Sequence, residues 1–402
     1  MKKFLVILVV VMLVAAISFV GCKTGTATET TATETVAETT AFAIPDKITI
    51  GWTPPDITGV FKTVTDFYDK GAADATANGI NVEVITQSVS THTNFADQVA
   101  IIEDFISRNV DVIALSPIEV EPIIPAMQKA NTAGIPIIVN NVGEPIAGVD
   151  ATYVGYDNAK AAACCAYALI DYFGGPGILG TGEKVDAPID TVLDLAWWEN
   201  VYKDVDPASL DINIDLAIIE GIAGGYFSAA RLVGFHGVID KYPGINIVST
   251  QAGDWNREKS IKVTEDILTA NGPGKLDAIW CASNEMGLGA MLACEKAGRL
   301  ETVDSGGTIG DELVAISTYD GTPESIVALK EGKLISEVQL CFYSWGWYSV
   351  ATAVSLALGL ETPEFFDVKP RMGYKENADN FYPNPVLEPI DWDSMKQGKP
   401  AL

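Results

Sequence analysis

Apolar and polar positions alternate along this chain in a repeating order of short strands and amphipathic helices. The runs 110–115 and 135–139 are almost continuously apolar, as strands are when helices cover both faces of a parallel sheet. Between them, Val99, Ile102 and Phe105 recur at helical spacing. The pattern predicts strands at 47–52, 81–85, 110–115 and 135–139, and helices at 63–78, 95–108 and 123–133.

The same order restarts after Asp150. Helices are predicted at 158–173, 229–241, 257–271 and 286–297, and strands at 215–219, 245–248 and 277–281. This alternation predicts an α/β protein with two Rossmann-like lobes built on parallel sheets. Open sheets of this kind bind ligands at the carboxyl ends of their strands, so two facing lobes would enclose a ligand in a cleft.

The start of the chain carries an export signal. Two lysines precede a mostly apolar run over 4–20, and Gly21-Cys22 follows. A small residue directly before a cysteine resembles the site where a bacterial lipoprotein signal peptide is cleaved and the cysteine receives lipid. We therefore predict a signal peptide over 1–21, lipidation of Cys22 and a membrane-anchored protein outside the cytoplasm, in the periplasm or at the cell surface. An uncleaved transmembrane helix is the alternative, because about 20 apolar residues can span a bilayer.

The composition narrows the picture further. The 22–45 segment is rich in Thr, Ala and Glu, so it buries too little apolar surface to fold and is predicted to be a disordered tether. The rest of the 402 residues, with 48% hydrophobic residues overall, suffices for more than one domain. The formal net charge of −27 repels phosphate backbones, so no nucleic-acid partner is expected.

Neither the histidines nor the cysteines indicate chemistry. His92 and His236 are the 2 histidines, and neither has a Ser or Cys partner at a spacing typical of a catalytic triad. We expect no enzyme activity, no catalytic residues, no metal and no other cofactor. Of the 6 cysteines, Cys22 is assigned to lipid, Cys164 and Cys165 are adjacent in an Ala-rich helical stretch, and the other three are scattered in apolar settings; none forms a CxxC motif. Apart from Cys22, they are predicted to be small buried hydrophobic residues, and a disulfide is the alternative.

A series of short segments completes the sequence evidence. In chain order they are Asp111–Pro117, Ala133–Pro136, Gly155–Asn158, Arg231–Phe235, Gly253–Trp255, Ser283–Ala290 and Tyr319–Pro323. Their order and spacing from about 47 to about 360 resemble the ribose/galactose branch of type I periplasmic sugar-binding proteins, which are substrate-binding lipoproteins of ABC transporters. The stretch 174–213 does not match and is interpreted as an insertion or a diverged region.

The resemblance implies two lobes joined by a three-segment hinge. The chain would cross near Tyr156, near Gln339, and between Gly359 and Asp367. The amino-terminal lobe would then comprise 46–155 and 340–366, and the carboxy-terminal lobe 156–339 and 367–402.

The resemblance also implies a ligand site at the cleft. Aromatic rings would stack on the C–H faces of a sugar, and polar groups would bond its hydroxyls. The implied ligand-binding residues are Trp52, Thr53, Asp56, Phe61, Asn141, Arg231, Trp255, Asn284, Tyr319, Asp320 and Gln339.

Each of the main site residues has a structural alternative. Trp255 and Trp52 could pack in the core, and Arg231 could be a solvated surface residue. Asp320 could cap its own loop in an Asx-turn. Asn284 could cap the helix that begins near Met286, or serve both purposes.

Two departures from the family pattern leave the identity of the sugar open. Asn141-Val142 stands where these sugar binders often have Asp-Arg, and Ser116 stands where a ribose binder has Asn. The predicted ligand is therefore a small neutral sugar or polyol of unspecified identity.

The predicted function is an extracytoplasmic solute-binding protein of an ABC importer, which closes about its hinge on the ligand and delivers it to a membrane permease. We expect it to be a monomer. A ligand-presenting sensor for a membrane receptor, or a binder of a non-sugar solute, is the alternative. Sugar-responsive repressors share the two-lobed body but carry a DNA-binding head, where this chain has an export signal and a tether.

Overall fold

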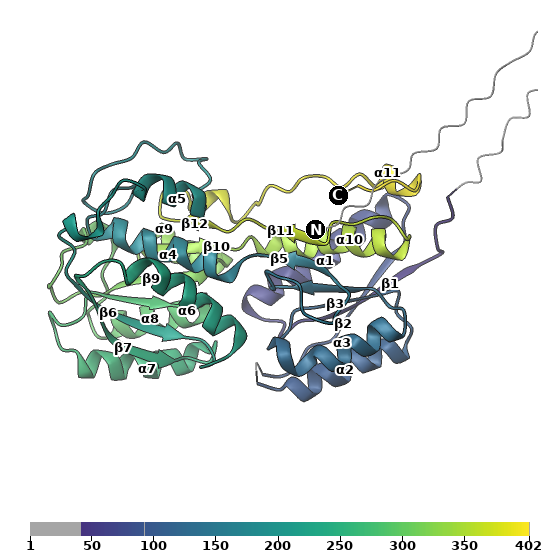
Figure 1. The fold of residues 1–402 in the computed structure, drawn as a ribbon, viewed down its shortest axis with the longest axis horizontal. Helices are drawn as coiled ribbons and strands as arrows, with labels where there is room; N and C mark the ends of the chain where they lie inside the picture. The colour runs from purple at the N-terminus through teal and green to yellow at the C-terminus, as the bar shows by residue number, and fades with distance from the viewer. Residues whose placement is uncertain (1–41, 92, 402) are drawn as a thin grey trace, which may run out of the picture. The chain divides into compact units, whose positions relative to one another are not determined.

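The computed structural model describes residues 42–91 and 93–401, which form two α/β lobes (Figure 1). The predicted signal peptide, Cys22, most of the predicted tether and His92 lie outside the described residues. Among the helices that are described, none combines the length and the apolar character needed to cross a bilayer.

The first lobe is built on a six-stranded sheet in which every neighbouring pair of strands is parallel. Its order is β11-β5-β4-β3-β1-β2, so the edge strand β11 comes from a distant part of the chain. The strands are β1 (Ile48–Thr53), β2 (Val82–Thr86), β3 (Val112–Leu115), β4 (Ile137–Asn140), β5 (Thr152–Gly155) and β11 (Phe365–Asp367).

Helices cover both faces of this sheet. Successive side chains of a strand point to opposite faces. In β3, Val112 and Ala114 belong to the same buried cluster as residues of α1 and α10, whereas Ile113 and Leu115 belong to a second cluster with α2 and α3. The near-continuous apolar strands that the sequence shows are therefore buried on both sides. The helices are α1 (Gly59–Ala77), α2 (Phe95–Ser107), α3 (Val120–Thr132) and α10 (Phe342–Ala357).

The second lobe repeats this plan with one antiparallel edge. Its sheet has the order β12-β10-β9-β8-β6-β7, and only β12 runs against its neighbour β10. The strands are β6 (Ile214–Glu220), β7 (Ile245–Ala252), β8 (Ala278–Cys281), β9 (Ala315–Asp320), β10 (Ser336–Gln339) and β12 (Arg371–Gly373). The α-helices are α4 (Asn158–Tyr172), α5 (Leu195–Tyr202), α6 (Tyr226–Ile239), α7 (Arg257–Ala270), α8 (Asn284–Lys296) and α9 (Pro323–Lys330), with 3-10 turns η1 (Pro207–Ser209), η2 (Val303–Ser305) and η3 (Ala378–Asn380).

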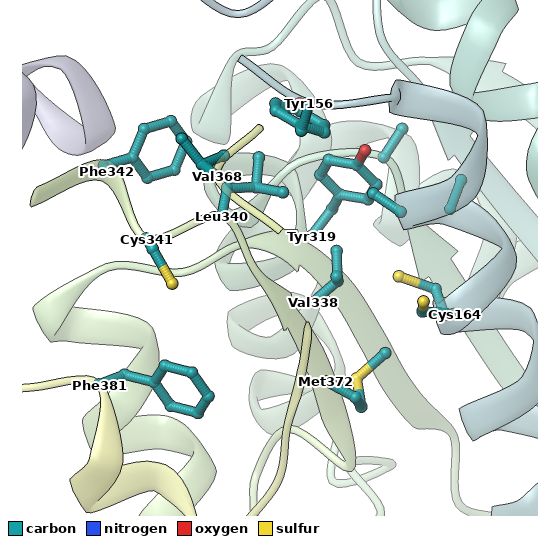
Figure 2. Packing of buried hydrophobic residues seen from close by; sticks show 14 of the residues in the cluster. Tyr156, Cys164, Tyr319, Val338, Leu340, Cys341, Phe342, Val368, Met372 and Phe381 are labelled. Atoms are coloured by element: carbon teal, nitrogen blue, oxygen red, sulfur yellow. The ribbon is translucent and has the colours of Figure 1, made fainter. Parts of the chain in front are cut away.

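Three chain segments connect the lobes, after β5, after β10 and after β11. Each contributes a buried residue to the apolar cluster that Figure 2 shows: Tyr156, Leu340 and Val368. Cys341, in the second segment, adopts a left-handed φ of 51° where strand β10 gives way to helix α10. Each crossing is therefore anchored in the core by at least one buried side chain.

The third crossing lies later in the chain than the sequence predicts. We expected it between Gly359 and Asp367, with the amino-terminal lobe ending at 366. In the structure β11 still pairs in parallel with β5 through Asp367, and β12 begins at Arg371. The chain therefore crosses within 368–370, because β11 completes the edge of the first sheet.

The C-terminal segment also differs from the prediction, which placed all of 367–402 in the second lobe. After β12 the chain returns to the first lobe, where α11 (Trp392–Lys396) lies against α1 (Figure 1). Trp392 donates its indole N–H to the Asp74 carboxylate at 2.6 Å, and Lys396 bonds the carbonyl of Asn78 at 2.9 Å. Burial of the Trp392 ring and these two bonds hold α11 against the first lobe.

The stretch 174–213 contains α5 and η1 but no strand of either main sheet. Trp198 on α5 is fully buried, with Tyr202 and Tyr167 of α4 as aromatic neighbours. The five cysteines of the described region are free and buried, which confirms their prediction as small core residues.

Candidate functional site

A cavity of about 650 Å³ lies at the carboxyl ends of the strands of both sheets. From the first lobe and the crossing it is lined by Pro55, Asp56, Thr58, Gly59, Val60, Phe61, Ser90, Thr91, Thr93, Pro117, Ile118, Asn141 and Phe342. From the second lobe it is lined by Phe227, Arg231, Asp254, Trp255, Asn256, Arg257, Glu258, Lys259, Ser283, Asn284, Glu285 and Asp320. Its volume is in the usual range for small-molecule sites.

Seven of the eleven predicted site residues line this cavity, and the other four lie behind it. The lining residues are Asp56, Phe61, Asn141, Arg231, Trp255, Asn284 and Asp320. The remaining residues, Trp52, Thr53, Tyr319 and Gln339, are at most 1% exposed.

Arg231, on α6, is buried, and each nitrogen of its guanidinium group donates to the protein. Its Nη2 donates to the Tyr156 hydroxyl at 2.9 Å and its Nε to Asn158 Oδ1 at 3.1 Å. Its Nη1 donates to the carbonyl of Ala282 and reaches Asp320 Oδ1 at 3.4 Å. The group is thus a fixed positive charge at the base of the cavity, held by neutral acceptors and one carboxylate.

Asp320 ends β9 in a left-handed conformation, with φ of 99°. Such a conformation is costly for a non-glycine residue, and it turns the chain at a point where the side chain reaches the cavity. Besides Arg231, the carboxylate accepts the backbone N–H of Asn284 at 3.1 Å. Burial raises the pKa of Asp320, while Arg231 and the Asn284 N–H oppose that rise.

Two residues that line the cavity, one from each lobe, have a carboxamide oxygen without a hydrogen-bond partner. Asn284 Oδ1 and Asn141 Oδ1 are both buried and make no hydrogen bond within the protein. The amide nitrogen of Asn284 donates to Thr322 Oγ1 at 2.7 Å, which orients the group. Ser283, rather than Asn284, caps α8 by accepting the N–H of Met286. The Asn284 side chain is therefore free of the capping role that the sequence allowed.

Trp255 lies half-buried between Arg231 and the start of α7. Asp254 and Trp255 are consecutive left-handed residues with φ of 51° and 58°, so the chain turns sharply after β7. This turn lays the indole over Gly221, where a Cβ atom would lie 2.0 Å from the ring. The Arg231 guanidinium stands 5.1 Å from the ring centroid. The exposed part of the ring offers the cavity an apolar face.

Trp52 and Thr53 have no surface in the cavity because β1 is fully covered at its end. The Trp52 indole donates to Thr65 Oγ1 at 2.9 Å and stacks on Tyr68 with ring centroids 4.5 Å apart. Thr53 Oγ1 is buried without a hydrogen-bond partner. Both belong to the packing between β1 and its covering helices.

Tyr319 and Gln339 support the cavity from behind. The Tyr319 hydroxyl donates to the carbonyl of Asn158 at 3.1 Å, and its ring lies 4.1 Å from the Arg231 guanidinium. Tyr319 and Tyr156 stand next to the interlobe crossings (Figure 2). Gln339 donates to the buried Glu337 carboxyl at 2.8 Å and packs so closely on Gly321 that a Cβ atom there would lie 2.1 Å from its Oε1.

Several lining residues carry no signal in the sequence. Phe227 precedes the predicted helix and Phe342 follows a crossing, so only their place after a strand could have drawn attention to them.

Each lining cation is paired with acid residues. Arg257 bonds Glu285 and Glu324, Lys259 bonds Asp254, and Arg231 approaches Asp320. Within the described part of the chain, no group of three His, Cys, Asp or Glu could hold a metal ion.

Two α/β lobes with three crossings and a polar, partly aromatic cavity at their strand ends define a protein that binds a small solute in a cleft. Residues 50–361 match the family model described as a periplasmic binding protein domain, and the chain belongs to that family. The predicted family and its two-lobed fold are thereby confirmed.

Individual solute-binding proteins are also similar to this chain in sequence and in structure. The ribose import binding protein of Bacillus subtilis is 24% identical over 250 residues, which is 62% of this chain and 64% of that protein. An ABC transporter periplasmic solute binding protein from Actinobacillus succinogenes with bound D-allose has a TM-score of 0.66 and 25% identity, over 83% of this chain and 100% of the other. A solute binding protein from Bacillus halodurans with bound myo-inositol has a TM-score of 0.63 and 25% identity, over 83% and 96%.

Proposed function

We propose that this protein is the extracytoplasmic solute-binding component of an ABC importer and captures a small neutral sugar or polyol. It acts as a monomer that binds rather than transforms its ligand, and hands it to a membrane permease. The observation that carries the proposal is the set of acceptors in the interlobe cavity. Asn141 and Asn284 line the cavity from opposite lobes and each have a buried oxygen without a partner, and Asp320 adds a carboxylate.

These acceptors suit hydroxyl groups, which donate through O–H and also accept. Charged ligands suit the cavity less well. A phosphorylated sugar needs free cations, but the lining cations Arg231, Arg257 and Lys259 are each paired with an acid residue. The half-buried Trp255 ring completes the site with a face for ligand C–H groups. The relatives that hold D-allose and myo-inositol support a neutral, polyhydroxylated ligand.

A thermal-shift panel of pentoses, hexoses, polyols, amino acids and sugar phosphates tests the ligand class. A ligand at about 100 times its Kd adds roughly 2.7 kcal/mol to the free energy of unfolding, which raises the melting temperature measurably. We expect one or more neutral sugars or polyols to raise it. Stabilisation by amino acids or sugar phosphates alone would contradict the assignment.

We also propose that the protein is anchored to a membrane through lipid on Cys22, with 22–45 as the tether. The support is the Gly21-Cys22 junction after the apolar run. In wild-type cells, fatty-acid label should appear on the mature protein and its first residue should be Cys22. The Cys22→Ser variant should lack the label and be found unprocessed or released. A mature wild-type protein that starts elsewhere and carries no lipid would refute the anchor.

A further inference from the structure

Glu119, in the first lobe, contacts the second lobe instead of capping its own helix. It occupies the N-cap position of α3 but makes no side-chain capping bond there. Instead its Oε2 accepts the backbone N–H of Tyr226, at the start of α6 in the second lobe, at 2.7 Å. Glu119 is only 8% exposed, so this bond is largely shielded from water.

The start of α6 is shaped to receive this carboxylate. The first N–H groups of a helix have no partner within it and carry a partial positive charge. The N-cap residue of α6 is Gly225, which has no side chain to bond them. A Cβ atom at Gly225 would lie 2.3 Å from Glu119 Oε1, so the glycine leaves the space that the carboxylate fills. The first lobe thus supplies the cap that the helix of the second lobe lacks.

An apolar contact accompanies the bond. Phe227, next to Tyr226, is buried and belongs to the first lobe's cluster with Val142 and Ile146. Both sides of the contact also border the ligand cavity, because Pro117 and Ile118 line it just before Glu119, and Phe227 lines it just after Tyr226. The bond between Glu119 and Tyr226 therefore fixes the spacing between two walls of the cavity.

We infer that Glu119 is an interlobe positioning residue, which holds the start of α6 against the first lobe and thereby slows release of the bound ligand. The inference rests on the proposed function for its effect on ligand, but the contact between the lobes is independent of which ligand binds. Glu119 is not among the residues that line the cavity, so it acts through α6, which carries Phe227 and Arg231.

The bond between Glu119 and Tyr226 should affect the rate of ligand dissociation. It forms only while the lobes are together, so it favours that state over a separated one by its own free energy. A ligand enclosed between the lobes leaves only after they separate. Loss of the bond should therefore speed dissociation, while association with separated lobes should change little.

The test compares Glu119→Ala, Glu119→Asp and Glu119→Gln with Glu121→Gln, an exposed glutamate on the same helix that serves as the control. Stopped-flow kinetics with a sugar or polyol from the panel should show about tenfold faster dissociation for Glu119→Ala, the loss typical of a hydrogen bond to a charged group. Glu119→Gln keeps an acceptor at the same reach and should fall between that variant and wild type. Glu121→Gln should match wild type.

Glu119→Asp separates positioning from stability. Its side chain is one methylene shorter and so withdraws from Tyr226, but Asp is a good N-cap for α3. We expect fast dissociation with an unchanged or higher melting temperature. An effect of Glu119 through α3 alone would instead leave dissociation slow in this variant.

Small-angle scattering without added ligand makes the inference testable even if no compound in the panel binds. Glu119→Ala and Glu119→Asp should have a larger radius of gyration than wild type and Glu121→Gln. An unchanged radius in both variants would overturn the inference. So would wild-type dissociation rates in both, where a ligand is available. If no compound binds, the proposed function is contradicted. The scattering result then decides whether Glu119 holds the two lobes together.

Discussion

Replacing Asp320 with asparagine is expected to weaken ligand binding by about tenfold to a hundredfold, measured as Kd by calorimetry. A hydrogen bond to a charged group contributes roughly 1.5–3 kcal/mol, and each 1.4 kcal/mol is about tenfold in affinity. The Asp320 carboxylate is buried at the base of the cavity, where water screens it little. Asparagine keeps its size and one acceptor oxygen but loses the charge.

Asp254→Asn is the matched control, because Asp254 also lines the cavity but is paired with Lys259 and half-exposed. Its effect should be much smaller, as for exposed ion pairs in general. Asp320→Ala should also lower the melting temperature, since it removes a buried counter-charge of Arg231. A wild-type Kd for Asp320→Asn, together with a lowered melting temperature, would show that Asp320 only shapes its turn.

The free energy of unfolding is expected to fall as pH rises from about 5 to about 8, with Glu337 as the largest single contributor. Burial raises the pKa of Glu337 from its ordinary value of 4.5 to about 8. The folded protein therefore keeps this proton over a range in which the unfolded chain has lost it. Since the folded state binds more protons there, stability present below pH 4.5 is lost as pH approaches 8. At about 1.4 kcal/mol for each pKa unit, this amounts to several kcal/mol.

Glu337→Gln should remove the largest single share of that slope, because glutamine stays neutral and can still accept from Gln339. The variant should match wild type near pH 5 and exceed it near pH 8 in urea unfolding. Burial also raises the pKa of Glu301 to about 7 and of Asp171 to about 6, so a substantial slope of the same sign should remain in this variant. The exposed Glu361→Gln should leave the slope unchanged. Equal slopes in wild type and Glu337→Gln would contradict the prediction.

Much of the fold could be predicted from the sequence because its signals are local. Runs such as 110–115 are apolar on both faces, and β3 is indeed covered by helices on both sides. The repeat of strand and helix predicts two lobes without any knowledge of contacts. The third crossing could not be placed as accurately, because β11 is defined by pairing with β5, some 200 residues earlier in the chain.

For the candidate site, too, local sequence predicts part of the answer and the tertiary structure decides the rest. Trp52 and Trp255 both lie at strand ends, and the sequence makes each a candidate for ligand contact, with stronger grounds for Trp255. The backbone decides between them. Trp52 continues an extended strand and packs on Tyr68, whereas the left-handed turn at Trp255 brings its ring to the cavity. Such a turn depends on the space that Gly221 leaves for the indole.

By itself, then, the sequence determined the class of fold, the family and the strand ends at which a ligand site would form, because hydrophobic periodicity and short motifs are properties of neighbouring residues. The tertiary structure alone decided which side chains face the cavity, that Arg231 is already engaged by its neighbours, and that two carboxamide oxygens are not. It also decided that Glu119 reaches Tyr226, 107 positions away. Burial and the direction of a side chain are set by contacts between distant segments, and no local pattern encodes them.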